Sequence, residues 1–532
     1  MVWLVAALMI DVFSLSGFAP DIDPNIAPGS ETALVIDCDG FYPTVRGLRR
    51  LSSLVETYPH LPERGSPVDD GACYGAYVAR FLDGGRKLFA GSRTALYYGS
   101  GGIWTHYSTL SDFSTDALDR WRFAMFGNDC IATNGSDSVQ VITNVGTNFV
   151  ALAGNPPSGK VVTTVNPGGS AAFVFMLNLF SSVPGNALTP SMWWCSGIGN
   201  DTSWTPDIAT QCANGYLDDT PGDILGAKPL GRNLIVYKER AVYAFEYVGP
   251  PTIWATRVTS TEAGALSHEA IADLGDIHFV MGFDNFYIVD GSGAPQPVDN
   301  PLRRFLFEGD LNRNFQAASQ LRFDRDQNVV YCHYPSVALD ENTTPQVLDK
   351  WVAWHRQSGR WTRGATDVEQ VVHPELPGTL GLTYGDFGSL YATWGEPDAV
   401  AYNSYLFSGS TEVVQAVFQP DAGMFTITGS PAAGGYLTLG DYGNGEQYIY
   451  IRRMRPKFAI YPENAGTYCA NTMRDNLGSP TTAIGSTAYL DSPDGWVNLR
   501  DNRRYHRFTY TFPAGDCELL GLDIDYMPAG VR

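Results

Sequence analysis

The sequence is poor in the residues that build metal centres and salt-bridged surface helices. Charged residues make up 17% of the 532 residues, and there are 8 histidines. The eight cysteines form no C-x-x-C pair and no Cys/His cluster with zinc spacing, which argues against a structural metal site. We expect them to be buried free thiols in a protein assembled in the cytosol.

Positive charge is also scarce, because 56 acidic residues outnumber 35 basic ones and the net charge is −21. Proteins that grip nucleic acid need patches of Lys and Arg to neutralise phosphates. The nearest approach to such a patch is Arg452–Lys457, and a short charge run of this kind indicates a strand edge with solvated side chains. The composition excludes strong adhesion to nucleic acid, but not nucleic acid that passes by.

Long apolar runs are missing as well. The opening run Met1–Ile10 is apolar, but it is too short to span a bilayer and has no basic residue before it, as a secretion signal would. We interpret it as an ordered arm that packs on the body or on a neighbouring subunit. No other segment is a transmembrane candidate.

Aromatic residues and turn formers are abundant. Aromatics make up 13%, and the chain has 56 Gly and 33 Pro, a mixture typical of many short strands separated by tight turns. Only Ser114–Phe126 and the stretch after Pro301 are modest helix candidates. The sequence therefore predicts an all-β protein.

Short strands recur in groups of four. One group covers Ala76–Leu82, Lys87–Gly91, Ala95–Gly99 and Ile103–Tyr107, and a second lies between residues 320 and 362. Both groups close with Gly-x-Trp-Thr, and four strands per ~45 residues is the period of propeller blades. We predict a β-propeller of about six four-stranded blades. Five or seven blades, or unrelated hairpins in a sandwich, remain open.

The strand pattern and composition divide the chain into four parts. Residues 1–70 form an N-terminal arm and lead-in segment, and residues 71–365 form the propeller. Residues 366–399, where Gly, Pro and acidic residues gather, form a linker region. Residues 400–532 alternate again and are expected to form a C-terminal β-sandwich.

The one match to a nucleotide-binding motif fails on its chemistry. The segment Gly154–Lys160 fits the first seven positions of a phosphate-binding loop. Pro156 and Pro157 lack the backbone N–H groups that such a loop points at phosphate, and Val161 lacks the hydroxyl that holds magnesium. We predict a plain loop between blades.

Other candidate sites also lack essential parts. The segment Asp324–Asn328 resembles half of a calcium loop and is better explained as a hairpin turn. His268-Glu269 lacks the second histidine of a zinc site, and there is no Gly-x-Ser-x-Gly elbow. Trp104 and Trp361 favour blade-core positions over sugar platforms. The sequence thus predicts no catalytic, cofactor-binding or metal-ligating residue, and no enzyme.

Several segments carry a resemblance to a known family. They are Phe18–Pro24, Ile36–Gly47, Asp119–Ala124, Trp193–Gly199 with Trp204–Pro206, and Val236–Arg240. Together, over residues 18–365, they resemble the tail nozzle family of short-tailed bacteriophages, which includes packaged-DNA stabilisation and tubular tail proteins. These are short structural motifs with no catalytic residue among them, and the resemblance does not identify residues that line a DNA channel.

The resemblance implies a propeller-bearing subunit that assembles as a hexamer. The ring would lie below the portal and adaptor proteins, beside tail fibres or spikes, and form the last section of the channel for double-stranded DNA. The protein would belong to the virion tail and assemble in the host cytoplasm, without a cofactor. The alternative is a carbohydrate-binding or glycan-hydrolysing propeller of a tail receptor-binding component. An extracellular adhesion propeller is a third option, and it would need a cleaved secretion signal.

Overall fold

The computed structural model describes most of the chain, namely residues 9–26, 28, 30–63, 71–109, 113–116, 119–169, 171–181, 189–291, 295–339, 347–372, 415–443, 445–462, 466–476, 483–490 and 495–529. Strands dominate these ranges, which confirms the all-β prediction. The helical elements found there are a π-helix, η1 (Arg304–Asp310), and a short 3-10 helix, η2 (Gln316–Ala318). Neither has the length and apolar character needed to cross a membrane.

Six consecutive four-stranded antiparallel sheets follow one another along the chain. Blade 1 contains β7 (Gly75–Arg80), β8 (Arg86–Gly91), β9 (Leu96–Ser100) and β10 (Ile103–His106), and blade 2 contains β11 (Arg122–Phe126), β12 (Asp129–Thr133), β13 (Gln140–Thr143) and β14 (Val150–Ala151). Blade 3 contains β15 (Ser158–Gly168), β16 (Ala171–Ser181), β17 (Thr189–Cys195) and β18 (Ala213–Tyr216). Blade 4 contains β19 (Ile224–Leu230), β20 (Asn233–Lys238), β21 (Val242–Gly249) and β22 (Ile253–Ser260).

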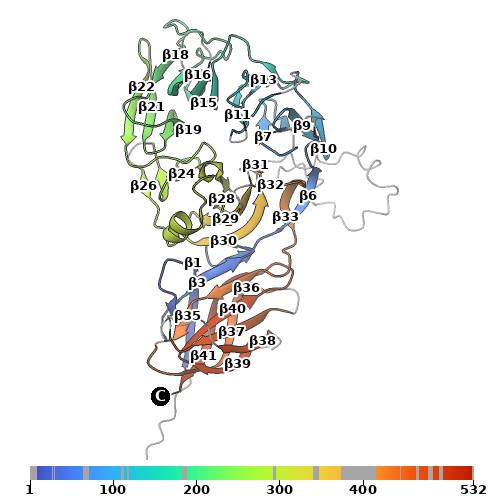
Figure 1. Cartoon of the computed structure of the whole chain (residues 1–532), viewed down its shortest axis with the longest axis vertical. Helices are drawn as coiled ribbons and strands as arrows, with labels where there is room; N and C mark the ends of the chain where they lie inside the picture. Colours follow the sequence, from blue (N-terminus) through green and yellow to red (C-terminus); the bar gives the residue numbers. More distant parts are fainter. Residues whose placement is uncertain are drawn as a thin grey trace, which may run out of the picture.

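Blades 5 and 6 complete the consecutive series. Blade 5 contains β23 (Ile271–Asp273), β24 (His278–Met281), β25 (Phe286–Val289) and β26 (Gln296–Pro297), and blade 6 contains β27 (Gln320–Asp324), β28 (Val329–Tyr334), β29 (Leu348–His355) and β30 (Trp361–Val368). The first strands of the blades contact one another in succession around a common axis (Figure 1). This is a propeller, as the four-strand recurrence predicted.

A seventh blade corrects the predicted count of six. It contains β31 (Gln370–Val372), β32 (Ala416–Gln419), β33 (Gly423–Gly429) and, as its outer strand, β6 (Ser53–Pro59). Strand β6 pairs antiparallel with β33 and comes from before blade 1, so the propeller takes strands from both sides of the range 71–365. The count of six was wrong because this blade is assembled from distant parts of the chain and does not repeat as one continuous segment.

The first and the last described strands meet in a second β structure below the propeller (Figure 1). One 13-stranded sheet contains β1 (Met9–Phe18), β2 (Asn25–Ile26), β3 (Thr32–Asp39), β4 (Phe41–Pro43), β5 (Leu48–Arg50), β34 (Tyr436–Leu439), β35 (Asp441–Gly443), β36 (Ile449–Ile460), β37 (Tyr468–Arg474), β38 (Ala483–Tyr489), β39 (Val497–Arg503), β40 (Tyr505–Thr511) and β41 (Glu518–Pro528). Strand β1 lies between β3 and β41.

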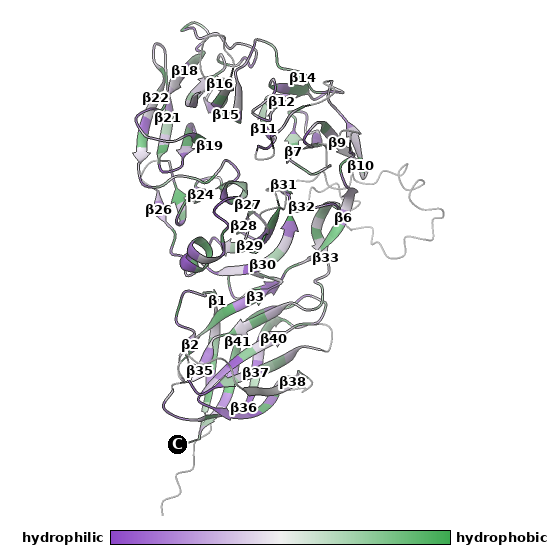
Figure 2. Cartoon of the chain, in the orientation of Figure 1, coloured by the Kyte–Doolittle hydropathy of each residue, from purple (hydrophilic) through white to green (hydrophobic). Residues whose placement is uncertain are grey.

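The C-terminal strands therefore share their sheet with the N-terminal ones. A C-terminal sandwich made from residues 400–532 stays a prediction. The predicted arm at residues 1–8 and the predicted linker after residue 372 lie outside the described residues. Figure 2 shows hydrophobic and hydrophilic residues interspersed along the strands. In β39, for example, buried and exposed residues alternate, as expected for a sheet with one buried face.

The sheet and the propeller join where β30 lies against β1, β3 and β4. Arg363 Nη2 on β30 donates to Asp37 Oδ1 at 2.5 Å, and the guanidinium lies 5.3 Å from the centre of the Phe18 ring. The Asp21 carboxylate accepts hydrogen bonds from the first backbone N–H groups of η1, those of Arg304 at 2.6 Å and Phe305 at 2.9 Å. One continuous hydrophobic core runs through this junction from the sheet into blades 5 and 6.

Candidate functional site: the central channel of the propeller

The first strands of the blades surround a cavity of about 410 Å³ on the propeller axis. Each blade places its first strand innermost, so residues far apart in the sequence face one another here. The walls include Tyr77, Phe123 and Phe323 on three different blades, and the rings of Tyr77 and Phe123 are stacked 5.8 Å apart. The remaining wall combines apolar side chains, such as Met125 and Leu321, with polar and charged ones.

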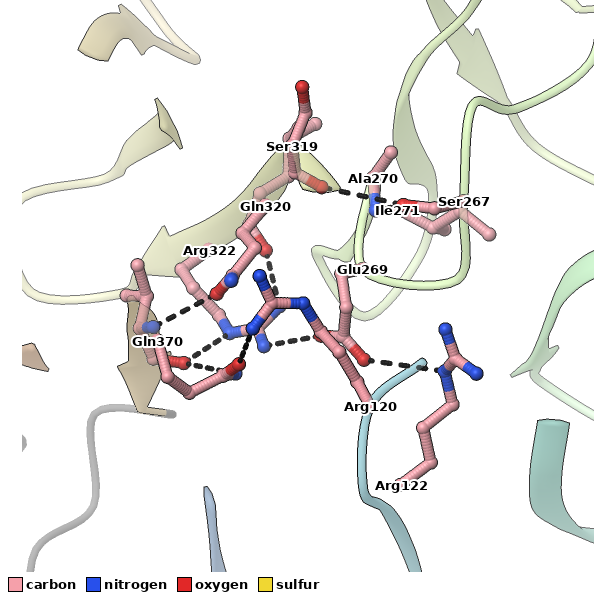
Figure 3. A network of polar contacts seen from close by, with 12 residues as sticks. Arg120, Arg122, Ser267, Glu269, Ala270, Ile271, Ser319, Gln320, Arg322 and Gln370 are labelled. Carbon is pink, nitrogen blue, oxygen red and sulfur yellow. Dashed lines mark hydrogen bonds and ion pairs between the residues drawn. The ribbon is translucent and has the colours of Figure 1, made fainter. Parts of the chain in front are cut away.

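A network of buried hydrogen bonds borders this cavity, and Gln370 and Glu269 belong to both (Figure 3). Arg120 Nη1 donates to the Glu369 carbonyl at 3.0 Å and to Gln370 Oε1 at 3.1 Å. Gln320 Nε2 donates to the same carbonyl at 3.0 Å, and Gln320 Oε1 accepts from the Val371 N–H at 2.9 Å. The network connects the start of blade 2 with blades 6 and 7.

A single carboxylate lies at the centre of the network. Glu269 Oε2 accepts from Arg322 Nη2 at 2.5 Å, and Glu269 Oε1 lies 3.8 Å from Arg122 Nε (Figure 3). Burial alone would raise the pKa of Glu269, but the positive charges around it, that of Arg322 first, outweigh burial and hold the pKa below its usual range. Glu269 is therefore an ionised carboxylate that holds two guanidinium groups from different blades.

His268, which precedes Glu269 in the chain, is uncharged. Burial lowers the pKa of His268 well below its usual value, so the ring is neutral, and Nδ1 lies 3.4 Å from the Ala227 N–H that donates to it. The sequence analysis considered His268-Glu269 only as an incomplete zinc motif. The structure places the pair in the wall of the channel, with the histidine as an acceptor and the glutamate as an ion-pair partner.

Cations outnumber carboxylates in the channel wall. Two carboxylates, Glu269 and Asp273, line the cavity together with five cationic side chains, which are Arg80, Arg122, Lys228, Arg322 and Arg325. Lys228 Nζ donates to the Ile271 carbonyl at 2.5 Å. Burial, and after it the charge of Arg322, lowers the pKa of Lys228 to about 8. The channel is thus locally basic in a chain whose net charge is −21.

The other segments singled out from the sequence are spread over the molecule. Gly154–Lys160 leads into strand β15, and Lys160 pairs with Asp119 at 2.9 Å. Asp324 Oδ1 accepts the backbone N–H groups of Asp326 and Gln327, which confirms the hairpin turn.

Both tryptophans of the Gly-x-Trp-Thr elements are blade-core residues, as predicted. Trp104 is 7% exposed and Trp361 is 1% exposed. The eight cysteines are all buried and free, which confirms that part of the prediction. Within the described ranges, no three His, Cys, Asp or Glu side chains come together in a way that could hold a metal ion.

The run Arg452–Lys457 corrects a prediction. It lies on β36, where Arg453 and Met454 pair with β39 on one side and β41 on the other, so this half of the run is not at a strand edge. Arg455–Lys457 pair with β41 alone. Arg453 Nε donates to Asp525 at 2.8 Å, and Arg455 Nη2 donates to Asp523 at 2.6 Å. Both carboxylates are almost fully buried. The charges are paired because the register brings these acidic and basic residues opposite one another.

Comparisons with known proteins add nothing on function. No family model matches the chain, and no curated protein matches it. Among solved structures, BBS1N in complex with ARL6DN has a TM-score of 0.40 at 8% identity, covering 72% of this chain and 98% of that one. The Neurospora crassa Pan2 WD40 domain has a TM-score of 0.38 at 8% identity, covering 73% and 97%. YCF48 from Cyanidioschyzon merolae has 0.35 at 10%, covering 57% and 91%. At these scores the blade count rests on the strand pairing of this chain alone.

Proposed function

We propose that this chain is a structural subunit of a short phage tail, a hexameric nozzle that forms the distal DNA channel, retains the packaged genome and conducts it during ejection. The observation that carries the proposal is the set of contacts that joins the propeller to the 13-stranded sheet. The outer strand of blade 7 comes from before blade 1. The ion pair of Arg363 with Asp37, the bonds of Asp21 to the start of η1 and one shared core hold the propeller to the sheet and its connecting segment. Such a body suits a role in which shape and stiffness are the function.

The segments that carry the family resemblance support this proposal by their positions. Phe18 and Asp21 belong to the first segment, and Asp37 and Thr44 belong to the second. All four lie at the junction, where Thr44 accepts through its carbonyl from Ser358 Oγ at 3.2 Å. The third segment contains Arg120 of the buried network. Residues of the first two resembling segments thus coincide with contacts between the two parts, whereas the other segments lie within the propeller.

The charge of the chain suits a channel through which DNA slides. Six copies at −21 each would carry −126 in total. An acidic lumen repels the phosphates and keeps the duplex mobile, because strong binding requires Lys and Arg that release counterions. The one basic run is paired with buried carboxylates at Asp523 and Asp525. Its four cations, Arg452, Arg453, Arg455 and Lys457, share these two carboxylates, so its charge is partly neutralised within the subunit.

The test is the assembly state of the purified full-length protein. We expect a six-membered ring when it is mixed with the portal and adaptor proteins of the same virion, measured by analytical ultracentrifugation and particle imaging. A monomer that forms no ring with those partners would refute the proposal. A glycan array with a glycoside hydrolase screen addresses the carbohydrate alternative, and clear binding or turnover would replace the nozzle proposal with it.

A further inference from the structure

We infer that a second cavity, bounded by blades 6 and 7 and the 13-stranded sheet, binds a small carboxylic acid whose carboxylate pairs with Arg50. The inference concerns a site away from the propeller axis and does not depend on the proposed function of the chain. It stands on a gap in the packing between two blades, on buried polar atoms around this gap, and on the charge of one of them.

The apolar packing of the propeller is interrupted between blades 6 and 7. Among the described residues, every other pair of neighbouring blades shares a hydrophobic cluster with buried residues from both members. The facing sides of blades 6 and 7 hold two separate clusters instead. One contains Val329, Tyr331, Trp351 and Ala353, and the other contains Val368, Val371 and Val417.

A cavity of about 350 Å³ lies beside these clusters and is partly open to solvent. Its apolar wall comes from both blades and includes Tyr331, Trp351 and Val417. Arg50, the last residue of β5, and Gly435, which directly precedes β34, bring the 13-stranded sheet into the wall. Protein interiors are otherwise densely packed, and a cavity of this volume has the size of a small-molecule site.

Three buried polar side chains in this wall have atoms without hydrogen-bond partners among the described residues. These atoms are Nε of Arg50, Nε2 of Gln415 and both ring nitrogens of His333. Arg50 and His333 are each 3% exposed, and Gln415 is 7% exposed. Buried polar atoms nearly always have partners, because leaving them unsatisfied is costly. Several such atoms around one cavity are what a binding site offers to its ligand.

The guanidinium of Arg50 is held by backbone groups. Its Nη1 donates to the Pro513 carbonyl at 3.1 Å, and its Nη2 donates to the Ala432 carbonyl. No described carboxylate forms an ion pair with it, and Asp39 in the cavity wall accepts the Ala365 N–H at 3.2 Å instead. Burial lowers the pKa of Arg50 more than the charges around it raise it. A bound carboxylate would supply the opposite charge that a buried cation requires.

A glycine keeps the guanidinium accessible. A Cβ at Gly435 would lie 2.7 Å from Arg50 Cζ and 2.9 Å from Arg50 Nε. A side chain at this position would therefore collide with the guanidinium or cover it. Because residue 435 is glycine, that face of Arg50 stays open beside the cavity that both residues line.

The other wall residues define the rest of the ligand. Gln415 Nε2 carries two N–H groups for further acceptor atoms. Burial lowers the pKa of His333 to about 3, so its ring is neutral and offers one N–H and one acceptor nitrogen. The rings of Tyr331 and Trp351 favour an apolar body. The ligand class is therefore a small carboxylic acid with an apolar or aromatic body and few other polar groups.

The test is calorimetric titration of the full-length protein with benzoate, benzamide and glucose at pH 7. Benzoate should bind saturably to one site per chain. Benzamide has nearly the same shape without the charge and should bind at least tenfold more weakly. No binding of benzoate at millimolar concentration, or equal binding of benzamide, would overturn the inference. Binding of glucose without binding of benzoate would also overturn it and would assign the cavity to a sugar.

Two glutamines on one strand test the location. Gln415 directly precedes β32 and lines the cavity, whereas Gln419 at the end of β32 does not. Gln415→Met should weaken benzoate binding at least fivefold, and Gln419→Met should bind benzoate like the wild type. Equal affinities of these two variants would place benzoate elsewhere and contradict the inference.

His333→Leu separates a binding role from a packing role. The ring nitrogens have no partner among the described residues, so leucine should leave the urea midpoint unchanged or raise it while benzoate binding weakens. A lower midpoint with unchanged affinity would show that His333 serves packing alone, and this would overturn the inference. Arg50 is tested through the ligand, by benzoate against benzamide, because its replacement would also break the bonds to Pro513 and Ala432.

Discussion

Replacing the central carboxylate of the propeller by its amide, Glu269→Gln, should destabilise the fold strongly. The amide keeps the shape of the side chain but removes the charge that neutralises Arg322, 2.5 Å away, and Arg122, 3.8 Å away. All three side chains are 11–12% exposed. Removing one partner of a buried pair leaves an uncompensated charge, so we expect a loss of about 3–5 kcal/mol in the free energy of unfolding.

The matched control is the same chemical change at a surface ion pair. Asp276 pairs with Arg356 Nη2 at 2.8 Å, but the Asp276 side chain is 66% exposed. Exposed pairs contribute about 0–1 kcal/mol, so Asp276→Asn should shift the urea midpoint little. If Glu269→Gln and Asp276→Asn lowered the midpoint equally, the network would not hold the blades together in the way described.

The pH dependence of the same variant checks the electrostatic cause. Glu269 has its pKa lowered below the ordinary value of 4.5, so the folded state binds fewer protons there than the unfolded state. Its stabilising contribution is complete above pH 4.5 and is lost as the pH falls below that value. The stability gap between the wild type and Glu269→Gln should therefore narrow on acidification. A gap that stays constant between pH 7 and pH 3 would refute this cause.

Three further outcomes follow from the packing. Arg363→Ala removes the 2.5 Å ion pair with Asp37 and the contact with the Phe18 ring. We expect a loss of about 2–3 kcal/mol in the free energy of unfolding and faster hydrogen exchange in β1 and β3. Unchanged exchange in these strands would contradict the role of Arg363 at the junction. Asp525→Asn removes the fully buried carboxylate that Arg453 contacts at 2.8 Å. It should cost about 3 kcal/mol in urea unfolding, and a cost as small as that of an exposed pair would contradict this. Thiol reagents should label none of the eight buried cysteines in the native protein and all eight in denaturant. The reason is that burial raises the pKa of these thiols, to about 12 for Cys38. Fast labelling of the native protein would refute this prediction.

Local strand patterns were sufficient to predict blades, because alternation and turns are written within about ten consecutive residues. The predicted runs Ala76–Leu82 and Lys87–Gly91 correspond to β7 (Gly75–Arg80) and β8 (Arg86–Gly91). The seventh blade was missed because β6 pairs with β33, more than three hundred residues later in the chain. No local pattern in the sequence indicates that two such distant strands pair. For the same reason, the sequence analysis assigned the N-terminal and C-terminal strands to separate parts, although they share one sheet.

The channel network depends on the same kind of distant pairing. Glu269 and Arg322 precede or occupy the first strands of neighbouring blades, and they meet only because those strands surround one axis. The pairing of Asp523 and Asp525 with the run on β36 likewise depends on register. A shift of one residue would turn the carboxylates to the other face of the sheet. Residue type alone indicated charge at these positions but not its partner.

The most direct test of the account is a cryo-electron microscopy map of the protein assembled with its portal and adaptor. We predict six copies around one axis, each with a seven-bladed propeller fixed to its 13-stranded sheet in the same orientation in every copy. A map without six-fold symmetry, or one in which the propeller takes different orientations relative to its sheet, would contradict the account.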